Sequence, residues 1–162
     1  MQRRSRIAGS ILIALLILVG SAFATMQLLA PPVIAEFVDF TELKRSGSDA
    51  LACAPGLCST RVDLMLAPLP LSAAEVVARI KALPRLEPRT EIVAADEASL
   101  RYVLVQRSAL FNVPDMINIA LQPLDASHTA LVLYSRAAQG PADLQMKRLQ
   151  RWLDLLGVAA VG

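Results

Sequence analysis

The sequence is poor in the side chains that most catalysis and metal binding require. Its 162 residues include one histidine, His128, and two cysteines, Cys53 and Cys58. A structural zinc site takes four cysteine or histidine ligands, so these residues do not suffice for one. The chain also lacks the G-x-S-x-G, H-E-x-x-H and C-x-x-C motifs and a glycine-rich phosphate loop. We therefore predict no catalytic residue, no cofactor and no metal.

Basic charge is scarce once the N-terminus is set aside. The formal net charge is +2, but without Arg3, Arg4 and Arg6 there are 13 basic and 14 acidic residues, a net charge of −1. Aromatic residues are few as well: four Phe, two Tyr and one Trp. Nucleic-acid binding needs a basic face, and single-strand binding also uses aromatic stacking platforms. We therefore expect no nucleic-acid partner.

What the chain does have is one long hydrophobic run. Residues 7–30, IAGSILIALLILVGSAFATMQLLA, contain no charged residue. About 20 apolar residues cross the hydrocarbon core of a bilayer, and arginines on a short flank favour keeping that flank in the cytoplasm. We therefore expect residues 1–30 to form a single-pass anchor in the inner membrane. The C-terminal domain would then lie in the periplasm of a Gram-negative bacterium.

The same residues also fit a cleaved signal peptide. Arg3 to Arg6 would be its basic start and Ala22-Phe23-Ala24 its small-x-small cleavage site. Cleavage after Ala24 would release a soluble periplasmic domain. Because apolar residues continue past that site to Leu29, we favour the uncleaved anchor.

The two cysteines lie close together, at Cys53 and Cys58, with a Pro-Gly pair between them. Both interpretations of the N-terminus export this part of the chain to an oxidising compartment, where nearby cysteines form disulfides. The spacing is C-x4-C, which does not match the C-x-x-C of redox-active pairs. We therefore predict a Cys53–Cys58 disulfide.

After the hydrophobic run we expect a linker over residues 31–50, one domain over 51–157 and a tail over 158–162. Phe37 and Phe40 in the linker are suited to dock on the domain.

Helix signals stand near both ends of the domain. Ser72, with a glutamate three residues on, is a capping box, and it predicts a helix that Pro84 ends. Pro141 and Asp143 suit the first turn of a second helix, and Gly157 suits its C-cap.

Between the two helices the hydrophobic period changes to two. Residues 90–95, 100–107, 116–121 and 129–135 read as strands joined by short polar turns, and a short strand at 62–66 precedes the first helix. We therefore predict an α+β fold with one antiparallel sheet packed with two helices, both on one face. Apolar residues on the other face would be explained by a cavity, a dimer interface or a second sheet layer.

Three short stretches stand out, and they are Leu110-Phe111-Asn112-Val113-Pro114-Asp115, Cys58-Ser59-Thr60, and Ser135 with Gly140, Asp143 and Leu144. They resemble parts of the bacterial domain of unknown function family 1499. The resemblance covers roughly residues 40–156 and implies an uncharacterised envelope or membrane-associated protein, with no established activity to carry over. The chain departs from the family at Asp115-Met116, where two aspartates are usual, and at Gln145 and Lys147.

Five polar residues at strand ends and at the start of the last helix form a possible polar site: Arg107, Asp115, Ser135, Arg136 and Asp143. As a cluster they would bind an anionic or polar group, with arginine as a forked donor and the helix start as an anion site. Alternatively the aspartates cap or turn the chain and the arginines are solvated or paired with them. We favour this structural interpretation, because caps and turns already account for these residue types.

Taken together, these features predict a binding or interaction module without catalysis. Its partners would be the membrane, through residues 7–30, and an envelope protein or a small apolar ligand. The alternative is an envelope hydrolase that uses Cys58 or a serine as nucleophile, which a free Cys58 would support and a closed disulfide would count against. A third hypothesis is an assembly factor that acts through the membrane helix itself.

Overall fold

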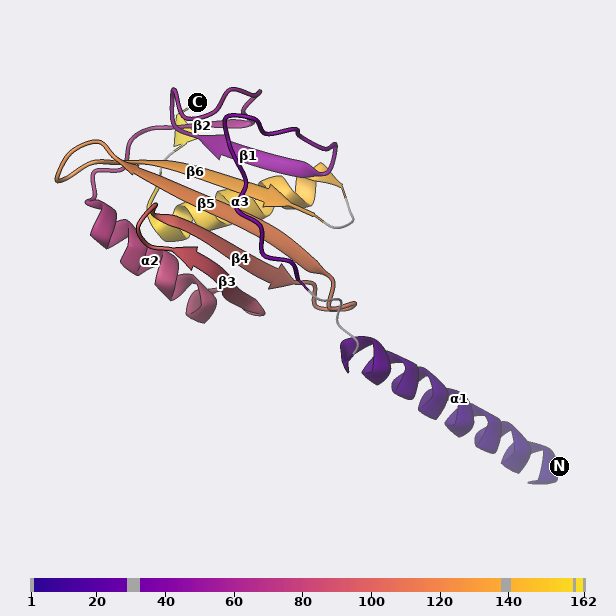
Figure 1. Cartoon of the computed structure of the whole chain (residues 1–162). Helices are drawn as coiled ribbons and strands as arrows, with labels where there is room; N and C mark the ends of the chain where they lie inside the picture. Colours follow the sequence, from indigo (N-terminus) through magenta and orange to yellow (C-terminus); the bar gives the residue numbers. More distant parts are fainter. Residues whose placement is uncertain (1, 29–32, 138–140, 159, 162) are drawn as a thin grey trace.

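The computed structural model describes residues 2–28, 33–137, 141–158 and 160–161, with side chains for 11–25, 33–137 and 141–158. Figure 1 shows a long N-terminal helix followed by a domain of strands and helices. The elements in chain order are α1 (Gln2–Leu28), β1 (Asp49–Cys53), β2 (Leu64–Leu66), α2 (Ala73–Leu86), β3 (Thr90–Asp96), β4 (Arg101–Arg107), β5 (Pro114–Pro123), β6 (Thr129–Arg136), α3 (Ala142–Leu156) and β7 (Ala160–Val161).

Helix α1 includes most of the hydrophobic run, and its large apolar side chains within residues 11–25 are exposed. Within the ranges described, no helix has the length and apolar character required to cross a membrane. The end of the predicted anchor at Ala30 and the first two residues of the predicted linker, Pro31 and Pro32, lie outside the described residues, as does Gly140.

One mixed sheet forms the centre of the domain, so the α+β class is confirmed. Its six longer strands lie in the order β3-β4-β5-β6-β1-β2, and the two-residue β7 extends the edge beyond β2. Strands β3 to β6 form the predicted antiparallel meander. Strand β1 pairs with β6 antiparallel but with β2 parallel, so the prediction of a purely antiparallel sheet was wrong. The loop between β1 and β2 is long enough to bring the chain back beside the start of β1, where the Asp63 N–H donates to the Leu51 carbonyl oxygen at 2.9 Å.

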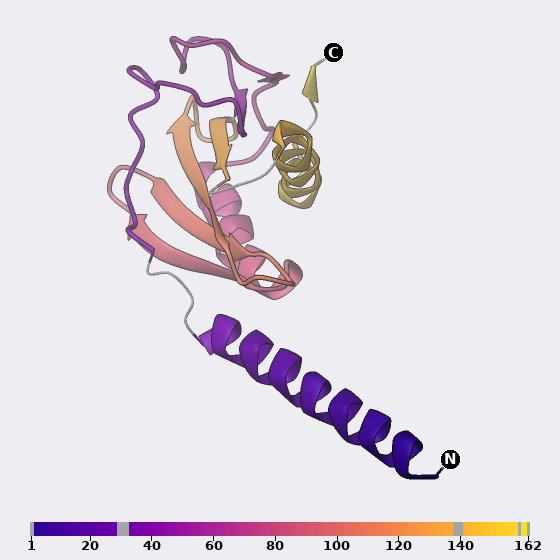
Figure 2. The same cartoon turned by 90° about the vertical axis from the view of Figure 1, so that its right-hand side faces the viewer.

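Helices α2 and α3 both pack on one face of the sheet, as predicted, and Figure 2 shows them on the same side. Alternation along the strands sends every second side chain to this face. Together these side chains form the main buried core, which includes Leu104 of β4, Ile117 of β5, Leu133 of β6, Ile80 of α2 and Trp152 of α3.

The helix ends follow their local signals closely. Ser72 caps α2 with the reciprocal capping box expected from the sequence. The helix continues past Pro84 to Leu86, so the predicted stop was two residues early. A proline removes one donor but leaves the last turn intact, and the Glu87 N–H still donates to the Leu83 carbonyl oxygen at 2.8 Å. Helix α3 ends at Gly157, whose φ of 76° is the left-handed C-cap conformation that glycine adopts without strain.

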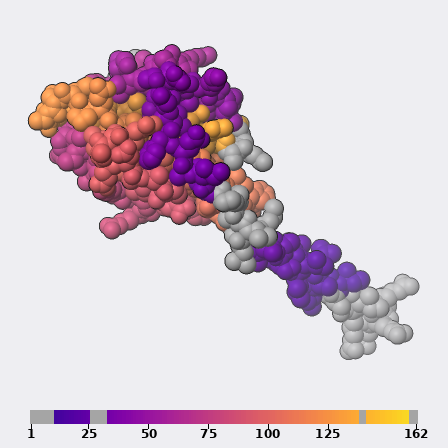
Figure 3. All heavy atoms as spheres, viewed as in Figure 1, coloured from indigo at the N-terminus to yellow at the C-terminus, as the bar shows by residue number. Residues whose placement is uncertain are grey.

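The opposite face of the sheet is crossed by residues 33–48, which we call the covering segment. Figures 2 and 3 show it lying across this face. Phe40 packs in a second cluster with Leu51 and Tyr134. The Asn118 side-chain oxygen accepts a hydrogen bond from the Val38 N–H at 3.1 Å. The expected docking of Phe40 is therefore confirmed, and the chain itself covers part of the apolar face.

A buried carboxylate, Asp49, ties the covering segment to the start of β1. The Arg45 guanidinium bonds Asp49 at 2.7 Å and Asp63 at 2.6 Å. Burial acts to raise the pKa of Asp49, but hydrogen bonds from Arg45, the Ser46 N–H and Tyr134 hold it below its usual value.

The predicted disulfide is confirmed: Cys53 and Cys58 are bonded.

Candidate functional site

A group of buried polar side chains lies at one end of the sheet, on the core-facing side of β4, β5 and β6. Gln106 lies on the core face of β4, and Asp115 is its direct partner in β5. Ser135 lies on the same face of β6, two residues beyond Leu133. The strand period that buries leucine and isoleucine therefore places these polar groups against α3.

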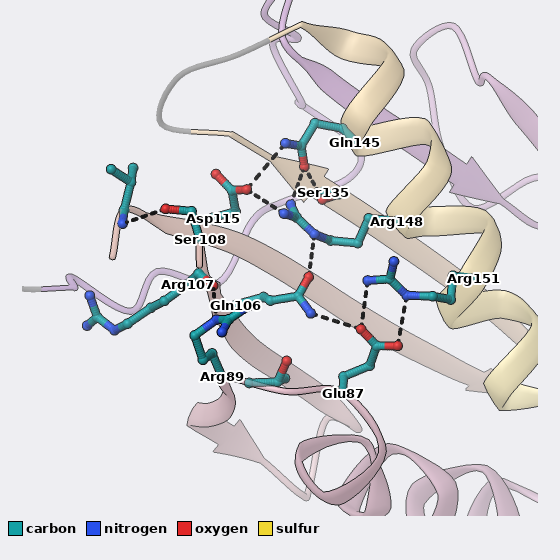
Figure 4. Close-up of polar contacts among 12 residues, drawn as sticks. Glu87, Arg89, Gln106, Arg107, Ser108, Asp115, Ser135, Gln145, Arg148 and Arg151 are labelled. Atoms are coloured by element: carbon teal, nitrogen blue, oxygen red, sulfur yellow. Dashed lines mark hydrogen bonds and ion pairs between the residues drawn. The ribbon is translucent and has the colours of Figure 1, made fainter. Parts of the chain in front are cut away.

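Helix α3 supplies the partners of these strand residues. Arg148 donates from Nη2 to Asp115, from Nη1 to Gln145 Oε1 and from Nε to Gln106 Oε1, each at 2.6 Å. Ser135 Oγ also donates to Gln145 Oε1 at 2.6 Å. Figure 4 shows the Arg148 side chain extending from α3 to Gln106 of β4 and Asp115 of β5. Arg148 is thus held in place by three acceptors.

A second carboxylate continues this network toward α2. Glu87, one residue after α2, receives two hydrogen bonds from Arg151, at 2.8 and 2.7 Å, and one from Gln106 Nε2 at 2.9 Å. Burial acts to raise the pKa of Glu87, but the hydrogen bonds from Arg151 and Gln106 hold it below its usual value. Glu87 is therefore an ionised anchor for Arg151 at neutral pH.

Beside this network lies an open cleft of about 490 Å³, which we call the arginine cleft. Among the described residues that line it are four arginines and a single carboxylate, Glu87, so this lining carries net positive charge. The lining residues are Glu87, Pro88, Arg89, Gln106, Arg107, Ser108, Ala109, Arg148 and Arg151.

The other two arginines, Arg89 and Arg107, are held less tightly by carboxylates than Arg148 and Arg151 are. Arg89 Nε donates to the Arg107 carbonyl oxygen at 3.2 Å, and within the described chain no carboxylate lies within ion-pair distance of Arg89. Arg107 contacts the exposed Glu91 at 3.8 Å and the Asn112 carbonyl oxygen at 3.3 Å. Arg89 has a φ of 56°, a conformation that non-glycine residues adopt uncommonly.

The five predicted site residues do not form one cluster. Asp115 and Ser135 meet through Gln145, and Arg107 lines the arginine cleft. Arg136 lies instead in a groove on the covered face, and Asp143 is exposed in the first turn of α3.

Sequence reasoning missed six residues of this region. A usable signal existed for two of them: Gln106 follows Tyr102 and Leu104 at strand spacing, and Gln145 precedes Leu149 at helix spacing, so both are polar residues at core-facing positions. The six residues are Glu87, Arg89, Gln106, Gln145, Arg148 and Arg151.

The residues that a hydrolase could use are far from one another or already bonded. Cys58 is in the disulfide, and a disulfide sulfur is not a thiolate nucleophile. Ser108 precedes β5 and accepts a hydrogen bond from the Val113 N–H, whereas His128 follows β5 and bonds Asp125 at 2.9 Å. Among the described residues no group of three His, Cys, Asp or Glu side chains could hold a metal ion.

Comparisons of the chain with models of protein families, with curated proteins and with solved structures gave no match. The resemblance to the bacterial domain of unknown function family 1499 therefore stays a prediction.

Proposed function

We propose that this chain is a bacterial envelope protein, anchored in the inner membrane by residues 7–30, whose periplasmic domain is a binding module without catalysis. The module takes an anionic group, a phosphate or a carboxylate, into the arginine cleft. The observation that carries the proposal is the pair Arg89 and Arg107, which line an open cleft beside two arginines held by carboxylates.

Three features of the cleft favour an anionic ligand. Guanidinium groups present several N–H donors in a planar fork that matches phosphate and carboxylate oxygens. Arg148 and Arg151 have their positions set by Asp115 and Glu87, so ordering them adds little entropic cost on binding. Arg89 keeps N–H groups of its guanidinium for a ligand, because its described hydrogen bond uses Nε.

The location rests on the sequence and on the disulfide. The uncharged run of residues 7–30, which extends beyond the residues that the structure describes, supports the anchor, and a disulfide is typical of an oxidising compartment such as the periplasm. The resemblance to family 1499 implies the same class of envelope protein. A protein partner or a small apolar ligand, the partners expected from the sequence, remains compatible with a binding module.

Binding can be tested on the full-length chain in detergent micelles with pyrophosphate and citrate as probes, by titration calorimetry. The Arg89→Gln/Arg107→Gln double variant should bind pyrophosphate at least about tenfold more weakly, because each charge-assisted hydrogen bond contributes about 1.5–3 kcal/mol. Arg61→Gln removes an exposed arginine outside the cleft and should bind as the wild type does. Wild-type protein that binds neither probe, or a double variant with unchanged affinity, would refute the anion site.

The anchor has its own test, the intact mass of the chain purified from the membrane fraction under non-reducing conditions. A full-length mass, lighter by two hydrogens, is the expected result. A chain that begins at Thr25 would show that residues before it are a cleaved signal peptide and that the anchor proposal is wrong.

A further inference from the structure

The hairpin tip between β4 and β5, residues 108–113, presents two large apolar side chains to solvent. Leu110 is 56% exposed and Phe111 is 54% exposed. The tip has a defined shape, because the Ser108 N–H donates to the Val113 carbonyl oxygen at 2.9 Å and the Val113 N–H donates to Ser108 Oγ at 3.1 Å. Single exposed apolar residues are ordinary, but an adjacent pair that includes an aromatic ring on an ordered tip suits an apolar environment.

The same tip forms one wall of the arginine cleft. Ser108 and Ala109 line the cleft together with Arg89 and Arg107. Apolar and aromatic side chains next to arginines are the combination that binds the interface of an anionic bilayer, with the rings at the boundary of the acyl chains and the cations at the headgroups. The contact between Arg107 and Glu91 is 3.8 Å long and its Glu91 side is exposed, so it contributes little and does not hold Arg107 away from a phosphate.

The hairpin tip lies at the end of the sheet from which the chain leaves toward α1. Val33 and Ile34 line a groove with Pro114, the first residue of β5, and Pro114 directly follows the tip. Leu28 ends α1 five residues before Val33, a separation of at most about 18 Å. Ile34, 82% exposed, adds a further apolar side chain here. Figure 1 shows the tip at this end of the sheet.

From these observations we infer that the anion bound in the arginine cleft is the headgroup phosphate of an anionic phospholipid in the bilayer that holds α1, with Leu110 and Phe111 inserted at the interface. This inference rests on the proposed function and names the ligand of the same cleft. The anchor keeps the tip within reach of the bilayer, so a weak interfacial contact suffices to orient the domain against the membrane.

The test places tryptophan at the tip and measures quenching by lipid. The full-length chain is reconstituted in nanodiscs of phosphatidylcholine, or of equal parts phosphatidylcholine and phosphatidylglycerol, with and without bromine on the acyl chains. The variant is Phe111→Trp, and the matched control is Leu124→Trp. Leu124 is 51% exposed and follows β5 at its other end, about 30 Å away. Trp152 is buried in the core and supplies the same background emission to both variants.

In the mixed discs with phosphatidylglycerol, bromine on the acyl chains should quench the emission of Phe111→Trp. The emission of Leu124→Trp should be the same in discs with and without bromine. The quenching should fall in pure phosphatidylcholine, and it should fall again when Arg89→Gln and Arg107→Gln are added to Phe111→Trp. Quenching that is equal in both lipids and insensitive to the arginines would overturn the headgroup site.

These measurements distinguish a failure of the phospholipid as ligand from a failure of the proposed anchored module. An unquenched Phe111→Trp variant that is present in the discs and still binds pyrophosphate overturns the lipid ligand and leaves a soluble anion as the ligand of the cleft. A chain that does not enter discs of either composition overturns the anchored module and this inference together.

Discussion

Removing the Asp115 carboxylate should destabilise the domain more than almost any other single polar substitution at this end of the sheet. Its side chain is 11% exposed and that of Arg148 is 14% exposed, with Nη2 and Oδ2 2.6 Å apart. In the Asp115→Ala variant, Arg148 keeps its bonds to Gln106 and Gln145 but loses the counter-ion with which it is largely buried.

The expected magnitude follows from the burial of the pair. Breaking a buried ion pair from one side costs about 3–5 kcal/mol, since it leaves an uncompensated charge. Both side chains keep a little exposure, so we expect the lower end, about 3 kcal/mol in the free energy of unfolding. Arg148→Met should cost a similar amount, because it leaves the Asp115 carboxylate without its cation. Asp115→Leu combined with Arg148→Met removes both charges and should cost clearly less than either single charge removal.

The assay is urea unfolding of the full-length chain in detergent, followed by tryptophan emission. Trp152 is the single tryptophan and is buried on α3, so its signal reports unfolding of this core directly. An Asp115→Ala loss below about 1 kcal/mol would refute the reasoning, because that is the value of an exposed pair. So would a double variant as unstable as the sum of the two single charge removals.

Three further predictions use the same unfolding assay. Reducing the Cys53–Cys58 disulfide, which closes a loop with a sequence separation of five, should lower the unfolding free energy by about 2 kcal/mol, and an unchanged urea midpoint would contradict this. Glu87 has a folded pKa below its usual 4.5, so its stabilisation is present above that value and is lost as the pH falls through the lower folded pKa. The Glu87→Gln variant should therefore show a shallower loss of stability in acid, and parallel curves would count against the assignment. Ser72→Ala should cost about 1 kcal/mol through the lost cap of α2. Ser72→Thr keeps a hydroxyl that accepts from the Glu75 N–H and donates to the Glu75 carboxylate, so it should keep most of the stability that the cap contributes, and equal losses in both variants would show that the cap is not the cause.

The elements predicted well from the sequence depend on contacts between near neighbours in the chain. The cap at Ser72, the C-cap at Gly157 and the alternation in β4 to β6 are each read within a few residues, and the structure has each of them. The apolar stripe of each helix predicts that it packs on the sheet, because only that stripe is apolar.

The first strand shows why other elements were missed. Strand β1 is buried along its whole length, with Ala50 and Ala52 toward the helices and Leu51 and Cys53 toward the covering segment. The strand is only five residues long and two of its residues are alanine, which has little preference for strands, so the sequence gives no clear strand signal for it. Its parallel pairing with β2 depends on the path of the intervening loop, which no local pattern reports.

What the sequence by itself determined is the order and type of most elements, the α+β class and the disulfide between two cysteines five positions apart. Tertiary structure alone decided the candidate site. Asp115 meets Arg148, 33 positions along the chain, and Glu87 meets Arg151, 64 positions along, because strand register and helix packing bring these residues to one end of the sheet. Contacts at such separations are set by the global arrangement of the elements, and side-chain types at separate positions along one chain do not encode which of them will meet.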